Sequence, residues 1–82
     1  MSAVRDVVEV LARELTDKPE QVEVRESDHK ATTLVELFVA PGELGKVIGK
    51  QGRTAAALRT LAATAGEKEG KTVTLEIRDG KP

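Results

Sequence analysis

The sequence lacks cysteine, tryptophan and tyrosine altogether, and it has a single phenylalanine, Phe38. The missing cysteine excludes disulfide bonds, thiolate metal sites and cysteine nucleophiles. A small domain without disulfides must be held together by packing alone, which suits a reducing cytoplasm. The near absence of aromatic side chains also excludes a surface on which successive bases stack, as in RRM or cold-shock domains.

Long apolar segments are missing too. No run approaches the ~20 apolar residues of a membrane-spanning helix, and Asp6 and Glu9 interrupt the apolar start, so it does not predict a signal peptide. A chain of 82 residues fits one domain with a thin core and little room for a deep catalytic pocket. We therefore expect one soluble, cytoplasmic domain over residues 1–82, with residues 79–82 as a flexible tail.

Catalytic and metal-binding patterns are also absent. His29 is the only histidine, it lies in the polar segment "SDHK", and neither Ser2 nor Ser27 has a visible base beside it. We therefore expect no enzyme activity, no metal and no cofactor.

Charge is distributed unevenly along the chain. Residues 1–45 carry five Lys or Arg and ten Asp or Glu, a balance of −5, whereas residues 46–82 carry eight and four, a balance of +4. Residues 46–59 contain no acid and four cations, namely Lys46, Lys50, Arg53 and Arg59. Such a basic patch on a nearly neutral protein indicates a directed anionic partner, although a solvated helix face explains four charges equally well.

The first half of the chain predicts a helix followed by a β-hairpin. The helical face comprises Val4, Val7, Val8, Leu11, Ala12 and Leu15, with Ser2 as N-cap and Asp17-Lys18-Pro19 as the stop. In "QVEVRE", Val22 and Val24 point inward, "SDHKA" is a turn with its acids outward, and "TTLVELFVA" is a second strand. The second strand places Val35, Leu37 and Val39 on one face, and Leu34, Glu36 and Phe38 on the other.

The second half predicts two helices and a final strand. Residues 43–48 form a short helical turn, and residues 52–65 form an alanine-rich helix that Gly66 ends. The predicted buried face of this helix comprises Ala55, Leu58, Leu61, Ala62 and Ala65. In "TVTLEIR", Val73, Leu75 and Ile77 point inward. The order α-β-β-α-α-β predicts an α+β fold in two layers, three helices on one face of a three-stranded sheet, with parallel pairing possible for the last strand.

The segment "GKVIGKQGR", residues 45–53, concentrates glycine and positive charge. Gly49 and Gly52 allow a tight turn between two helical segments, and the N–H groups at the start of the second helix suit a phosphate. Lys50 and Arg53 flank this end, and Lys46 lies one turn earlier. A bare G-x-x-G is more often a plain helix–helix turn. The spacing fits neither a Walker A loop nor a dinucleotide fingerprint.

The context of this motif resembles the KH domain. Its V-I-G-x-x-G hallmark matches Val47-Ile48-Gly49-Lys50-Gln51-Gly52, and the element order resembles the bacterial type II KH arrangement. The stretch "APGELGKVIGKQGRTAAALRTLAATAGEKEGKTVTLEI" further resembles small stand-alone bacterial KH proteins of the KhpA, or YlqC-like, family. This resemblance extends from the first helix to the last strand, so it implies a single KH domain.

The resemblance implies a binding site for about four nucleotides of single-stranded RNA. It assigns the backbone clamp to Gly49, Lys50, Gln51 and Gly52, an apolar floor to Ile48, and close base approach to Thr54 and Ala55. Lys46 and Arg53 add charge, and residues 66–71 form the opposite rim. It further implies a post-transcriptional regulator or RNA chaperone that acts as a homodimer or with a larger Jag/KhpB-type KH protein. The group of Leu34 and Phe38, predicted to be exposed, and the outer side of the long helix are the candidate contact surfaces.

Two other functions stay open at this point. A protein–protein adaptor with little RNA binding is the main alternative, although the intact glycines and surrounding cations argue against it. An enzyme acting on phosphate esters would need a nucleophile–base pair or metal ligands, and neither is visible. Single-stranded DNA is an alternative ligand, because recognition of a 2′-hydroxyl does not follow from the sequence.

Overall fold

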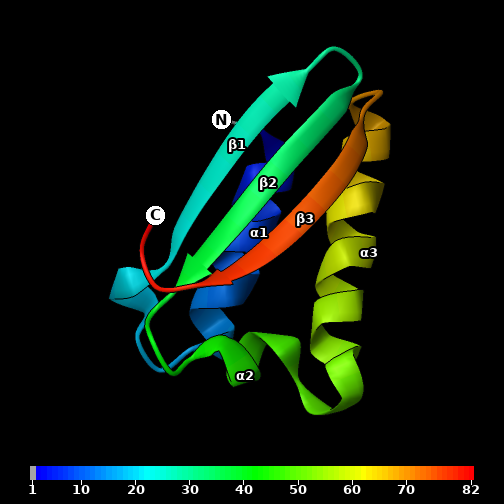
Figure 1. Cartoon of the computed structure of the whole chain (residues 1–82). Helices are drawn as coiled ribbons and strands as arrows, with labels where there is room; N and C mark the ends of the chain where they lie inside the picture. The colour runs from blue at the N-terminus through cyan, green and yellow to red at the C-terminus, as the bar shows by residue number, and fades with distance from the viewer. Residues whose placement is uncertain (1) are drawn as a thin grey trace.

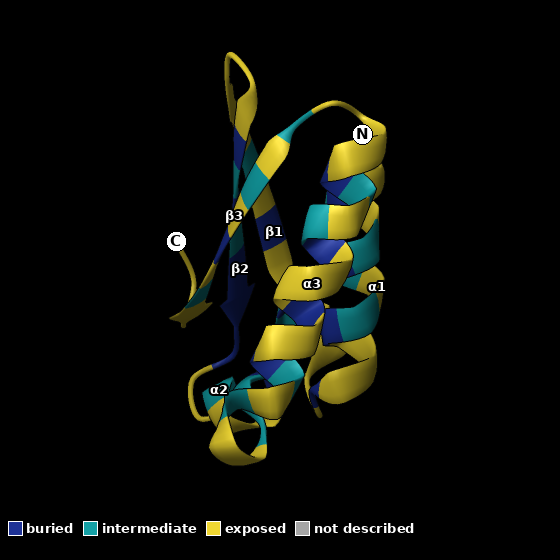
Figure 2. Cartoon of the chain, turned by 90° about the vertical axis from the view of Figure 1, so that its right-hand side faces the viewer, coloured by how far each residue is buried: buried dark blue, intermediate teal, exposed yellow. Residues whose placement is uncertain are grey.

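A computed structural model describes residues 2–82. It contains a three-stranded sheet with α1 and α3 on one face, and α2 at the end of the sheet where β2 finishes (Figures 1 and 2). The elements are α1 Ala3–Leu15, β1 Glu23–His29, β2 Thr32–Val39, α2 Leu44–Ile48, α3 Arg53–Lys68 and β3 Thr72–Asp79, with short 3-10 helices η1 Pro19–Gln21 and η2 Lys50–Gly52. The predicted α+β order α-β-β-α-α-β is confirmed, and it is the order of a type II KH fold.

The sheet has the order β1-β2-β3, with β1 antiparallel and β3 parallel to the central strand β2. The predicted alternation is confirmed, because Val35, Leu37 and Val39 of β2 are buried against the helices. Leu75 of β3 completes this layer, and Val73 and Ile77 are half-buried beside it. The register fixes which residues share the helix-facing side of all three strands.

Helix α1 begins where the sequence predicted. The Ser2 hydroxyl accepts a hydrogen bond from the Arg5 backbone N–H at 3.1 Å, which satisfies one of the N–H groups left open at a helix start. Val4, Val8 and Ala12 are its buried residues. They meet α3 and the sheet, so α1 closes one side of the core.

Helix α3 runs further than predicted, and Gly66 does not end it. The helix continues to Lys68, and Gly66 is one of its buried residues. A Cβ atom at position 66 would lie 2.3 Å from Cγ2 of Val73, so glycine is needed for the close approach of α3 to β3. The chain reverses instead at Gly70, whose φ is +71°.

Leu61 of α3 is a second correction, since it is 47% exposed rather than buried. The buried residues of α3 are Ala55, Leu58, Ala62 and Gly66, a stripe in steps of three and four. Leu61 lies one position beside this stripe. It therefore faces away from the sheet.

The hairpin and the outer sheet face also differ from prediction. Strand β1 continues through His29, so the turn is only Lys30 and Ala31. Phe38 does lie on the outer face, but it is only 6% exposed, flanked in register by Glu23 and Arg78. The predicted exposure of Phe38 is therefore wrong, and Leu34 beside it is half-buried. At the other end of β2, the Gly80 N–H donates to the Val39 carbonyl at 2.8 Å, which continues the pairing beyond β3.

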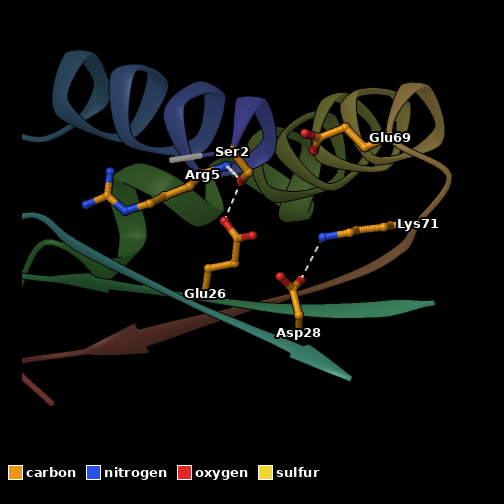
Figure 3. A pocket seen from close by; sticks show the side chains of 6 residues that line it. All are labelled: Ser2, Arg5, Glu26, Asp28, Glu69 and Lys71. Atoms are coloured by element: carbon orange, nitrogen blue, oxygen red, sulfur yellow. Dashed lines mark hydrogen bonds and ion pairs between the residues drawn. The ribbon is translucent and has the colours of Figure 1, made fainter. Parts of the chain in front are cut away.

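Two acids of β1 point toward the helices rather than outward. Glu26 and Asp28 pair in register with Val35 and Thr33, on the helix-facing side. They line a polar hollow between the start of α1 and the α3–β3 loop, together with Ser2, Arg5, Glu69 and Lys71 (Figure 3). Asp28 accepts a hydrogen bond from the Thr33 hydroxyl at 2.7 Å and lies 3.1 Å from Nζ of Lys71. The Asp28–Lys71 ion pair therefore joins β1 to the start of β3.

This ion pair predicts an acid-sensitive contribution to stability. The Thr33 hydrogen bond, and then Lys71, lower the pKa of Asp28 below 3.8, so its contribution is present above that pH and is lost as the pH falls through the folded-state pKa. In thermal unfolding from about pH 7 to pH 2, the difference in Tm between native and Asp28→Asn should shrink toward zero at the acid end. Glu76→Gln, an exposed carboxylate outside every ion pair of the described residues, is the control. A difference that stays constant with pH would contradict this account.

The buried glycine of α3 gives a stability prediction. Gly66→Ala should lower the free energy of unfolding by about 1–3 kcal/mol, because overpacking against Val73 outweighs the ~1 kcal/mol gain in helix propensity. Gly45→Ala in α2 is the matched control, since a Cβ there would meet nothing within 4 Å. It should be neutral or stabilising. Urea denaturation of both variants measures the difference, and equal effects would show that the contact with Val73 is unimportant.

Candidate functional site

The G-x-x-G turn lies where α2 passes into α3, beyond the end of β2 (Figure 1). Three of its four residues have left-handed backbone angles, with φ of +75° at Gly49, +55° at Gln51 and +72° at Gly52. Glycine adopts such angles freely, whereas Gln51 does so at a cost of roughly 1–2 kcal/mol. A non-glycine residue in this region is locally strained, and the surrounding contacts must hold it there.

Gly49 is required for more than its backbone angle. A Cβ atom at this position would lie 2.2 Å from Oγ1 of Thr54, so the Thr54 side chain packs directly over the glycine. The Gly49 N–H donates to the Gly45 carbonyl at 2.9 Å, and the Gly52 N–H donates to the Gly49 carbonyl at 3.2 Å. Hydrogen bonds within its own backbone, and packing against the first turn of α3, therefore hold the turn in place.

The start of α3 is open to an anion. Its N-cap, Gly52, has no side chain to bond the first N–H groups. The Arg53 N–H donates to the Lys50 carbonyl, so the remaining donors of the first turn and the positive end of the helix dipole suit an anion. Lys50 and Arg53 are exposed, and neither pairs with a carboxylate within residues 2–82. Arg53 Nη2 instead donates to Oε1 of Gln51 at 2.9 Å, which sets the guanidinium beside the turn. The turn thus combines the positive end of a helix with two available cations.

Two of the predicted site residues are placed differently. Nζ of Lys46 is held by the Asp17 carboxylate and lies 3.6 Å from Oε2 of Glu43, so its charge is already paired. Ala55 is only 3% exposed and belongs to the core beneath α3. Ile48, Gly49, Lys50, Gln51, Gly52, Arg53 and Thr54 form one continuous, accessible segment.

Sequence reasoning missed the apolar surroundings of this turn. The sheet order makes β3 an edge strand, and its second half lies beside α2. Leu44 of α2 and Ile77 of β3 are half-buried and pack against the core, so they add apolar surface near Ile48. The alternation in β3 indicated that Ile77 points inward. It did not indicate which edge of the sheet would meet α2.

The partners of Lys46 were also missed, because Asp17 is 29 residues away in sequence. No local pattern connects these two positions. Elsewhere, residues 2–82 contain no group of three or more His, Cys, Asp or Glu side chains that could hold a metal ion. Within the same range, no helix is long and apolar enough to cross a membrane.

Comparison with known proteins gives a consistent result. A family model described as "KhpA/KhpB, KH domain" matches residues 5–77. A protein of Aquifex aeolicus named RNA-binding protein KhpA is 54% identical over 77 residues, which cover 94% of this chain and 98% of that protein. Proteins of the same name from Clostridium perfringens and Chlamydia trachomatis are 48% and 39% identical, covering 89% and 92% of this chain and 97% and 96% of theirs.

No solved structure shows significant similarity to this chain. The matched relatives carry the name of an RNA-binding protein, and their family is not an enzyme family. The family match spans α1 to β3 and includes the whole G-x-x-G turn. The resemblance predicted from the sequence is therefore confirmed, and the chain belongs to the KhpA/KhpB family of KH-domain proteins.

Proposed function

We propose that this protein binds single-stranded RNA and that its G-x-x-G turn holds the sugar–phosphate backbone of about four nucleotides. One observation carries the proposal: the start of α3, which has no side-chain cap, lies between two exposed cations that have no carboxylate partner within the described residues, Lys50 and Arg53. The names of the relatives support the same ligand. Ile48 would provide the apolar floor on which bases lie, and Thr54 would let bases approach the first turn of α3.

The geometry favours contacts to phosphates over contacts to bases. Backbone N–H groups and cations recognise phosphate oxygens without regard to sequence, so they set position and affinity rather than base preference. Aliphatic residues near the turn, such as Leu44 and Ile77, can contact bases without stacking on them. We therefore expect sequence-tolerant binding that weakens as salt rises.

A footprint of about four nucleotides implies weak binding by one domain, and multivalency would overcome this. The proposed role is therefore that of a post-transcriptional regulator or RNA chaperone in the cytoplasm, acting through two KH domains. Those domains would belong to two copies of this chain, or to this chain and a KhpB-type protein.

The clamp is tested by the double variant Lys50→Asp, Gln51→Asp. Fluorescence anisotropy with a labelled single-stranded RNA of about eight nucleotides, twice the expected footprint, should show binding by the native protein that weakens with salt. The variant should bind about tenfold more weakly or worse, because it places two acids where phosphates would lie. Circular dichroism of both proteins verifies the fold.

The matched control is Lys81→Asp, Pro82→Asp, which makes the same charge change in the exposed C-terminal segment. This control should retain most of the native affinity. Equal losses in the two variants would mean that overall charge, not the turn, is responsible. If the native protein itself does not bind, the adaptor function becomes the better account. Single-stranded DNA of the same sequence tests whether the sugar matters.

The side of the helical layer that faces away from the sheet is the surface we propose for the second KH domain. Val7, Val10 and Leu11 of α1 and Leu61 and Ala65 of α3 line an apolar groove between the two helices. Val10 is 61% exposed and Leu61 is 47% exposed, which is unusual for such side chains in adjacent positions. The groove also carries charges of both signs, so a second copy of the same surface offers complementary partners.

Leu61→Asp tests this surface. Sedimentation velocity should show the native protein shifting toward a dimer as its concentration rises, and Leu61→Asp remaining a monomer, because a buried charge in an apolar interface is costly. Thr60→Asp, an exposed neighbour on α3, is the control and should still associate. A native protein that is monomeric at high concentration would argue against the homodimer, and mixing with a KhpB-type KH domain would then test the heteromer.

A further inference from the structure

The cation nearest to the G-x-x-G turn on its N-terminal side is held by acids. Lys46 lies on α2, one helical turn before Gly49. Its Nζ bonds the Asp17 carboxylate, which follows the end of α1, and lies 3.6 Å from Oε2 of Glu43. One positive charge is thus surrounded by two negative charges.

Glu43 fixes this arrangement in place. Its side chain is 10% exposed, and its Oε1 accepts a hydrogen bond from the backbone N–H of Asp17 at 2.6 Å. A buried carboxylate bonded to that backbone fixes the chain after α1 to the start of α2. The Asp17 side chain, by contrast, is 73% exposed and contributes only its charge to Lys46.

The two sides of the turn therefore differ in available charge. Lys50 and Arg53 have no carboxylate partner within the described chain, whereas Lys46 shares its charge with Asp17 and Glu43. A phosphate approaching from the α2 side would meet a local net charge of −1, that is, +1 from Lys46 and −2 from the two acids. It would have to displace Asp17 before it could use Lys46.

We propose that Asp17 withholds Lys46 from RNA phosphates and thereby limits the affinity of the G-x-x-G turn. This inference rests on the RNA binding proposed above. Removing the Asp17 charge would leave Lys46 with one carboxylate, Glu43, whose Oε1 stays bonded to the backbone of residue 17. Lys46, balanced then by Glu43 alone, would be able to reach one further phosphate.

The test is a cycle of Asp17→Asn and Lys46→Gln, each alone and combined, with the labelled RNA used above. Asp17→Asn should bind about fivefold more tightly at low salt, as expected for one exposed charge contact. The slope of log Kobs against log[salt] should steepen by about 0.7, the value for one more phosphate neutralised on a single strand. Lys46→Gln alone should change affinity less than about twofold, and the double variant should lose the gain.

Glu20→Gln is the matched control, because it removes one exposed carboxylate that pairs with no cation in residues 2–82. Its effect should be smaller than that of Asp17→Asn, and it should persist when Lys46 is also replaced. Asp17→Ser gives a second variant that keeps the backbone N–H bonded to Glu43. Both Asp17 variants should agree in affinity and in salt slope.

The proposal is overturned if Asp17→Asn binds the RNA no more tightly than Glu20→Gln. It is also overturned if Lys46→Gln loses as much RNA affinity as the double variant Lys50→Asp, Gln51→Asp. These outcomes leave RNA binding by the turn intact, provided that the native protein binds and the Lys50 and Gln51 double variant does not. Absence of binding by the native protein and by Asp17→Asn would overturn both proposals together.

Discussion

The parallel pairing of β2 with β3 determines where everything else in this fold can lie. Two neighbouring strands that run the same way require the chain to travel back along the sheet between them. Helix α3 makes that return: its 16 residues span about 24 Å at 1.5 Å per residue, close to the roughly 26 Å of an eight-residue strand such as β3. The turn into α3 must therefore lie beyond the carboxyl end of β2. The G-x-x-G turn is in that place, with its helix start directed away from the core, and Gly66 lets the returning helix approach β3 closely.

The same topology brings the acidic and basic halves of the chain together. Four ion pairs each join an acid from residues 1–45 to a cation from residues 46–82: Asp17 and Glu43 with Lys46, Asp28 with Lys71, and Glu36 with Arg78. Three of the eight cations of residues 46–82, Lys46, Lys71 and Arg78, are paired in this way. At the turn, only Lys50 and Arg53 retain an available charge beside the helix end. If the turn binds phosphates as proposed, two cations make few contacts, and the proposed second KH domain would supply the affinity that one domain lacks.

Features that depend on local patterns could be predicted from the sequence. The Ser2 cap, the alternation of β2, the element order and the G-x-x-G turn all follow from spacing and residue type. Features that depend on contacts between distant elements could not. Gly66 resembles a helix stop until Val73 is known to pack on it. The sequence of α3 has apolar residues in two adjacent stripes and does not indicate which stripe faces the sheet, so it predicted a buried Leu61. For the site, the turn residues were predictable, whereas the Asp17 partner of Lys46 was not, because that contact depends on where α1 ends relative to α2.

The closed geometry of the turn bears on how its affinity can change. Gly49 packs beneath Thr54, and Gln51 is already held in a left-handed conformation. The turn therefore needs little ordering when a ligand binds. Making it more rigid would therefore add little affinity. The number of cations that can reach a phosphate is the quantity left to vary. An ion pair such as that between Asp17 and Lys46 changes this number without altering the backbone. In the proposed complex with RNA, affinity would thus be tuned by exposed charges around a fixed turn, which single substitutions can change while the core stays intact.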